Sequence, residues 1–150
     1  MITNYIWMFL FVGLSILLFL IVPIYYIKKS LLFGLIGGFF LAVFEQILGV
    51  SLKWWSYNVS LVNVFNFPLG VALMWVPAVI LFGYIFHKYQ NIFTRIIIIF
   101  IFAAITTVFT YGSVLLNFRE YLNWNLYYDF GLALVTHLVL GIYLYWKEKQ

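Results

Sequence analysis

Five long apolar runs take up most of this 150-residue chain, and they constrain its fold more than any other feature. They cover about residues 5–27, 31–52, 67–86, 96–116 and 126–146. A helix that crosses a bilayer needs about 20 mostly apolar residues. Because backbone polar groups find no water inside a bilayer, helices are the expected way to satisfy them. The sequence therefore predicts an all-α, polytopic membrane bundle with five transmembrane helices in a single domain, residues 1–150.

The composition agrees with a location in the cell membrane. Hydrophobic residues make up 67% of the chain and charged residues only 8%, whereas soluble domains carry about 25% charged residues. The chain has no cysteine, which excludes disulfides and thiolate metal sites, and its two histidines are too few for a histidine-only metal centre. We therefore predict no metal and no cofactor. The net charge of +4 is scattered between the apolar runs, so a nucleic-acid partner is not expected.

The distribution of lysine and arginine predicts the orientation. With five spans, the connections alternate between the two sides of the membrane. One side receives Lys28, Lys29, Lys88, Arg95, Lys147 and Lys149, and the other receives Lys53 and Arg119. Cytoplasmic loops carry the excess of basic residues. The amino terminus is therefore predicted outside and the carboxyl terminus in the cytoplasm.

An acidic residue, Glu45, lies inside the second apolar run. Gly34, Gly38, Ala42, Glu45 and Gly49 recur at helical spacing and share one face. An ionisable side chain at membrane depth is a functional-site hypothesis by default, and about 22 Å of helix place it in the outer leaflet. Gly34 and Gly38 have the spacing that lets two membrane helices approach closely. This face is a candidate docking surface for a second copy or a partner membrane protein.

Other polar residues are expected to meet Glu45 in an outer-half pocket. The predicted pocket contains Glu45, Gln46, Thr107, Thr110, Asp129 and His137. Glu45, Asp129 and His137 are the catalytic candidates, and the substrate-binding candidates are Gln46, Trp55, Tyr57, Thr107 and Thr110. Structural alternatives stay open for the three titratable residues: Glu45 and His137 as hydrogen-bonding links between helices, and Asp129 as an anion at a helix N-terminus.

The segment after Glu45 resembles a known family. Between Phe44 and Leu69 an acid is followed by Trp54-Trp55-Ser56-Tyr57 and then by Phe67-Pro68-Leu69. This order is similar to that in the membrane domains of lycopene cyclases and related carotenoid-biosynthesis proteins. The resemblance implies a related fold and an isoprenoid ligand, with Glu45, Trp55, Tyr57 and Pro68 at corresponding positions. Where those cyclases carry paired glutamates, this chain has Gly70 and Val71.

A second resemblance extends over more of the chain. The five-run pattern, together with Tyr121-Leu122-Asn123-Trp124 before Tyr127-Tyr128, is similar to an uncharacterised family of small five-helix bacterial membrane proteins. This resemblance implies a topology and no chemistry.

Three classes of function remain open at this stage, and the sequence does not decide whether the chain is an enzyme. The first is a membrane subunit or lipid-binding protein of unassigned activity. The second is an enzyme acting on an isoprenoid or carotenoid-like lipid, with Glu45 as proton donor and aromatic rings stabilising a carbocation. The third is a small proton-coupled transporter that uses Glu45, Asp129 and His137.

Overall fold

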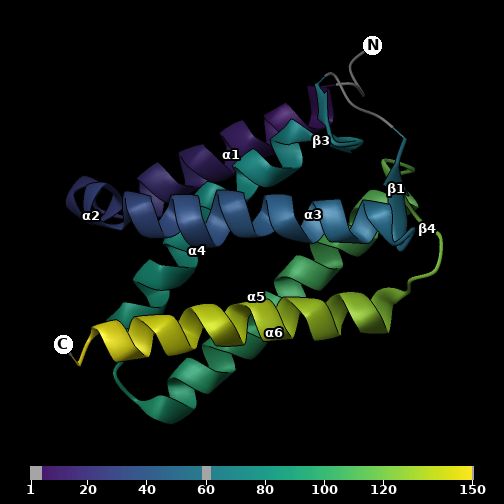
Figure 1. Cartoon of the computed structure of the whole chain (residues 1–150). Helices are drawn as coiled ribbons and strands as arrows, with labels where there is room; N and C mark the ends of the chain where they lie inside the picture. Colours follow the sequence, from purple (N-terminus) through teal and green to yellow (C-terminus); the bar gives the residue numbers. More distant parts are fainter. Residues whose placement is uncertain (1–4, 59–61, 150) are drawn as a thin grey trace.

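The computed structural model describes residues 5–58 and 62–149, and Figure 1 shows that most of this part is helical. Residues 1–4, 59–61 and 150 lie outside the described ranges. The helices are α1 (Ile6–Ile21), an unbroken helix over Ile24–Ser51, α4 (Leu69–Lys88), α5 (Ile92–Leu115) and α6 (Leu126–Lys147). The last four are long and apolar enough to cross a membrane, whereas α1 has only 16 residues.

The predicted boundary between the first two helices is wrong. A turn was expected at Lys28–Ser30, but the chain turns at Val22 and Pro23, and α2 (Ile24–Gly34) begins directly after the proline. Proline lacks a backbone N–H and has a fixed φ, so it ends a preceding helix and is well suited to the start of the next one. Lys28 and Lys29 therefore lie on α2 and not in a loop.

The long helix changes its winding in the middle. Between α2 and α3 (Leu41–Ser51), residues Leu35–Phe40 form the π-helical turn η2. This stretch packs closely on α4: a Cβ atom at Gly38 would lie 2.7 Å from the carbonyl oxygen of Trp75. At Gly34 a Cβ would lie 2.6 Å from the Ile80 side chain. The glycine face that was predicted to dock a partner is therefore already covered by α4 of the same chain.

Substitution of Gly38 by alanine is expected to destabilise the protein by about 1–3 kcal/mol, because the new methyl group overpacks against backbone atoms. The matched control is Gly131→Ala on α6, where nothing lies within 4 Å of the added Cβ. There the loss of backbone freedom in the unfolded chain makes alanine neutral or slightly stabilising. Thermal unfolding in detergent, followed by circular dichroism, compares the two. Equal melting temperatures would show that η2 and α4 are less tightly packed than described here.

The structure is mostly helical, as predicted, and two small antiparallel strand pairs cap one end of the helices. β1 (Trp55–Tyr57) pairs with β4 (Arg119–Tyr121), so that Trp55 lies opposite Tyr121. β2 (Asn63–Val64) pairs with β3 (Phe67–Pro68). Figure 1 shows β1 and β4 side by side at the end opposite the carboxyl terminus. We call this the strand end.

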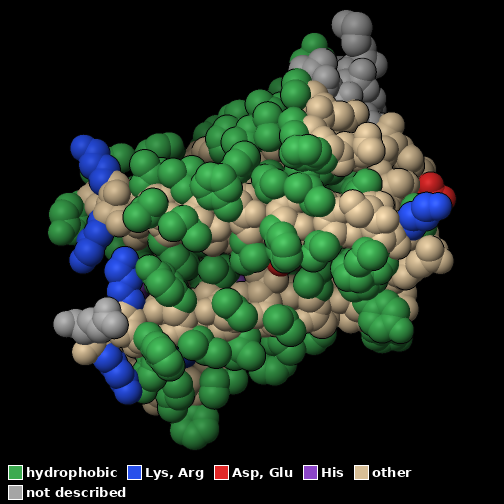
Figure 2. Space-filling model, in the orientation of Figure 1, with side chains coloured by type: hydrophobic (Ala, Val, Ile, Leu, Met, Phe, Trp, Pro, Cys, Tyr) green, Lys and Arg blue, Asp and Glu red, His purple; other side chains and the backbone are tan. Residues whose placement is uncertain are grey.

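The opposite end carries most of the basic side chains, and we call it the basic end. It contains Lys28 and Lys29 of α2 and the last turns of α4 and α6, which carry Lys88 and Lys147. Figure 2 shows these charges gathered at one end and a hydrophobic surface between the ends. A buried cluster fills the interior on this side and consists of Phe33, Val79, Phe82, Phe86, Ile98, Ile99, Leu140 and Leu144.

Candidate functional site

A small polar cavity lies among α3, α4, α5 and α6, towards the strand end. Its volume is about 50 Å³, which is room for roughly three or four water molecules at 10–15 Å³ each. The polar side chains that line it are Glu45, Gln46, Thr106, Thr110, Ser113, Arg119, Asp129, Thr136 and His137. The rest of the wall consists of glycine and aliphatic residues and of the aromatic residues Trp7, Trp55, Tyr57, Trp75 and Phe109.

The cavity brings together most of the residues predicted to meet. Of the candidates, Glu45, Gln46, Trp55, Tyr57, Thr110, Asp129 and His137 all line it. Thr107 does not: its hydroxyl donates to the Ala103 carbonyl at 2.8 Å, and its neighbour Thr106 faces the cavity. Successive residues of a helix point about 100° apart, so an error of one residue on α5 is enough to move a side chain from the cavity wall.

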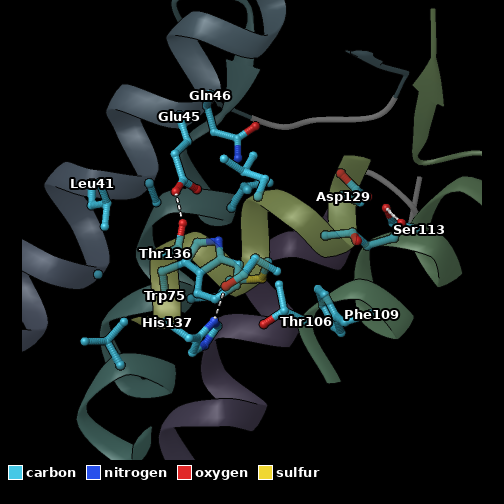
Figure 3. Close-up of a pocket in the computed structure, with 18 of the residues that line it drawn as sticks. Leu41, Glu45, Gln46, Trp75, Thr106, Phe109, Ser113, Asp129, Thr136 and His137 are labelled. Carbon is cyan, nitrogen blue, oxygen red and sulfur yellow. Dashed lines mark hydrogen bonds between the residues drawn. The ribbon is translucent and has the colours of Figure 1, made fainter. Parts of the chain in front are cut away.

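Glu45 is hydrogen-bonded across two helices. The Thr136 hydroxyl of α6 donates to Oε1 of Glu45 on α3 at 2.6 Å, as the dashed line in Figure 3 shows. The Glu45 side chain is half-buried. Nearer the basic end, α2, which belongs to the same long helix as α3, also contacts α6, where the rings of Phe33 and Tyr143 stack at 5.7 Å. Glu45 thus forms the link between helices that the structural alternative foresaw, and it also faces the cavity.

The surface of the molecule is hollowed next to Glu45. Figure 2 shows a depression between α3 and α6, with acidic surface at its floor and hydrophobic side chains around it. Glu45 lines the cavity on α3 and is half-buried, whereas Asp129, which also lines it, is only 5% exposed. Leu41 and Leu132 line the cavity on the same two helices. The cavity is therefore reached from the side of the helical bundle.

Gln46 holds the first strand in place. Its Oε1 accepts from the Trp55 indole N–H at 3.0 Å and from the Tyr57 hydroxyl at 2.6 Å. Both donors come from β1, which fixes this strand against α3. Because Oε1 is occupied by two donors, the amide N–H groups of Gln46 remain for whatever fills the cavity. Gln46 thus supports the wall of the site and offers it a donor.

The buried position of Tyr57 predicts a specific alkaline behaviour. Burial raises the pKa of Tyr57 from 10.0 to about 12. A phenol whose pKa is higher in the folded state contributes stability that is complete below pH 10 and is lost between pH 10 and about 12. Melting temperatures between pH 9 and 12 are therefore expected to fall more steeply for the wild type than for Tyr57→Phe. Parallel curves for the two proteins would contradict this expectation.

Asp129 lies in a cluster of donors at the strand end. Its Oδ1 accepts from Nη2 of Arg119 at 3.2 Å and from the Trp124 indole at 2.9 Å, and the Tyr121 hydroxyl donates to Oδ2. Asp129 and Arg119 are 5% and 4% exposed, so this is a buried ion pair. Asp129 lies in the first turn of α6, as expected if it were an anion at a helix N-terminus. The side chain that caps this helix is, however, that of Asn125.

Arg119 is the main residue that the sequence did not reveal. It was counted as a loop charge on the outer side, whereas its guanidinium lies buried 4.1 Å from the centre of the Trp55 ring. Its Nε has no hydrogen-bond partner within the described part of the chain. Burial and the hydrogen bond to Asp129 also raise the pKa of the neighbouring Tyr121. An arginine ten residues before a membrane-embedded aspartate was the one available hint.

His137 lies at the inner end of the cavity. Its Nδ1 is 2.8 Å from the Ala133 carbonyl, so this nitrogen carries the proton and Nε2 has the lone pair. Its ring packs edge-on to Phe82 at 5.2 Å and lies 6.4 Å from the Trp75 ring. These contacts agree with the alternative that His137 has a structural role in the packing of the helices. Beyond His137, towards the basic end, the described residues form the apolar cluster that contains Phe82 and Phe86.

The described residues contain no group of three or more acidic or histidine side chains suited to a metal ion. Comparison of the chain with known protein families, with characterised proteins and with solved structures finds no match. The resemblances to lycopene cyclases and to the small five-helix proteins therefore stay predictions from the sequence.

Proposed function

We propose that this chain is an integral membrane protein that binds a membrane lipid from the side, with one end of the lipid at Glu45. The observations that carry this proposal are the depression between α3 and α6 in Figure 2 and the hydrogen-bonded, half-buried pair Glu45 and Thr136, which joins these two helices and lines the cavity. In a membrane this depression faces the hydrocarbon interior, so a lipid can enter it without crossing water.

The surface supports the membrane location. Large apolar side chains are exposed on α1, on the long helix Ile24–Ser51, on α5 and on α6, among them Leu32, Phe93, Val108 and Trp146 at 67–73%, which is costly in water over so wide an area. Charged residues gather at the two ends. The excess of lysine at the basic end favours the cytoplasm for that end, the carboxyl terminus included, and the outer side of the cell membrane for the strand end.

The size of the cavity limits what it can hold. A volume of about 50 Å³ takes a few water molecules or a single small group. A whole isoprenoid or carotenoid does not fit inside, so only its end enters the cavity. The remaining hydrocarbon then lies in the depression and in the bilayer, where the apolar rim provides a matching surface.

Glu45 can act as an acid toward the end of the lipid that enters the cavity. A carboxylic acid that stays protonated in an apolar site can donate a hydrogen bond or a proton, and Thr136 holds its other oxygen at 2.6 Å. Aromatic faces from Trp7, Trp75 and Tyr57 surround the cavity and attract positive charge. The enzymatic form of the proposal is therefore proton transfer from the Glu45 carboxylic acid to an isoprenoid double bond, which leaves a carbocation and the Glu45 carboxylate. Loss of a proton from a neighbouring carbon to that carboxylate forms a new double bond and restores the acid.

The transporter alternative has less support. A proton path needs polar groups from one side of the membrane to the other. Here the polar groups of the cavity end at His137, and the described residues that separate it from the polar groups of the basic end belong to the apolar cluster.

Mass spectrometry of lipids that copurify in mild detergent tests the proposal. We expect the wild type to retain one lipid species in stoichiometric amount. Glu45→Gln keeps an oxygen for Thr136 but has no acidic proton, and it is expected to retain at least fivefold less of that lipid. Glu120→Gln, on the exposed side of β4, is the control and is expected to match the wild type.

A second pair of variants tests the side entrance. Leu132→Trp fills the cavity wall on α6, whereas Val135→Trp adds the same ring on an exposed position of that helix. Only the first is expected to displace the lipid. The same bulk phospholipid in all these proteins would overturn the proposal and leave Glu45 as a packing residue.

A further inference from the structure

A second and larger hollow lies at the basic end, far from Glu45. Its volume is about 530 Å³, and it is bounded by α2, α4 and α6. Polar and basic side chains form its outer part: Lys29, Ser30, His87, Gln90 and Lys147. The side chains of Phe33 and Leu144 form its inner wall. The hollow thus joins a basic mouth to an apolar floor.

The positive charge of this hollow is not balanced within the described part of the chain. Among the described residues that line it, only Glu148 is acidic; its Oε2 lies 2.6 Å from Nη2 of Arg95, and it also contacts His87. Arg95 is 2% exposed, so this ion pair is internal and neutralises the carboxylate. Neither Lys29 nor Lys147 forms an ion pair among the described residues, and the Lys147 ammonium lies 5.9 Å from the Tyr143 ring.

We propose that this basic hollow binds the phosphate group of an anionic phospholipid from the adjacent leaflet. Two lysine ammonium groups attract a phosphate ester. The Gln90 amide, one N–H of which donates to the His87 carbonyl at 3.3 Å, has a second N–H beside them. Lysines at the membrane surface attract anionic lipids in this way. The apolar wall of Phe33 and Leu144 lies where the first carbons of the acyl chains leave the headgroup. The proposal does not depend on the function of the Glu45 cavity.

A soluble phosphate shares this headgroup chemistry, and the apolar wall favours the lipid. The experiment places the protein in nanodiscs with equal amounts of phosphatidylglycerol and phosphatidylcholine and measures, by native mass spectrometry, which lipid stays bound. The test variant is Lys29→Gln with Lys147→Gln. The control, Lys88→Gln with Lys149→Gln, removes the same charge from the same end outside the hollow.

We expect the wild type and the control pair to retain phosphatidylglycerol with enrichments within twofold of each other. The enrichment of phosphatidylglycerol is expected to be roughly tenfold lower in the test pair than in the wild type, because the two lysines that it lacks contact the phosphate. Circular dichroism spectra and melting temperatures that match the wild type show that each variant is folded.

Two results would overturn the proposal. Equal losses in the two pairs would mean that the basic end attracts anionic lipids only through its general charge. Displacement of the bound phosphatidylglycerol by about 10 mM inorganic phosphate would show that the hollow recognises a soluble phosphate and not a lipid. Retention of the lipid at that phosphate concentration supports the proposal, since the apolar wall then contributes to binding.

Discussion

Asp129→Asn is expected to destabilise the protein by about 3–5 kcal/mol, the largest loss we predict for any polar substitution. The change removes the negative charge from a buried ion pair and leaves the Arg119 guanidinium, which is 4% exposed, without a counterion. An uncompensated buried charge carries a penalty of this size. The free energy of unfolding, measured by denaturant titration in detergent micelles, gives the comparison.

Two further variants separate the contribution of the buried ion pair to stability from that of other charges and hydrogen bonds at the strand end. Glu120→Gln removes an acidic charge from the same strand as Arg119, but Glu120 is exposed, so its cost is expected to stay below about 0.5 kcal/mol. Arg119→Met combined with Asp129→Leu removes both charges and is expected to recover much of the loss. A double variant as unstable as Asp129→Asn would show that the hydrogen bonds of Trp124 and Tyr121, not the charges, hold the cluster together.

The helices could be predicted because their cause is local. Runs of about twenty apolar residues specify long helices wherever they occur, and the predicted ranges 67–86, 96–116 and 126–146 agree with α4, α5 and α6 to within four residues. The first boundary failed because apolarity continues past Pro23, and hydropathy alone does not register a proline. The break in the helix depends on one missing N–H and not on the composition of the window.

The strands could not be predicted in the same way. β1 and β4 pair segments more than sixty residues apart, and neither segment has an alternating pattern of its own. Their pairing depends on where α3 and α5 end, which is a consequence of the whole bundle. Arg119 is buried because β4 pairs with β1. Since the sequence does not show this pairing, Arg119 was predicted to be an exposed loop charge that indicates the orientation in the membrane.

The part of the candidate site that could be predicted is the part that follows from helical periodicity. Helical spacing assigned Gln46, beside Glu45, and the polar face of α6 to one pocket, and the structure places these residues around a single cavity. The prediction failed at Thr107, where the rotation of α5 about its axis decides between two adjacent threonines. It also assigned Gly34 and Gly38 to a partner, because a close helix contact has the same sequence pattern within one chain and between two chains.

Trp55 is expected to close the cavity on the strand side, and its removal should have the second large effect. The residue is 1% exposed, its indole donates to Gln46 at 3.0 Å, and its ring lies 4.1 Å from the Arg119 guanidinium carbon. Trp55→Ala is therefore expected to cost about 3–5 kcal/mol. Trp54→Ala is the control, because Trp54 is less buried and stacks on Trp124.

The same substitution tests whether the depression between α3 and α6 is the working entrance. The chain has no cysteine, so Ser113→Cys introduces a single thiol in the cavity wall, at a side chain that is 7% exposed. A charged, membrane-impermeant maleimide is expected to label this thiol at least tenfold faster in the Trp55→Ala background than with Trp55 present. Trp55→Phe keeps a ring over Arg119 and is expected to stay close to the wild-type rate, which separates closure by an aromatic ring from general unfolding. If the thiol reacts equally fast with Trp55 in place, water reaches the cavity from the strand end, and a ligand has no need to enter from the lipid side.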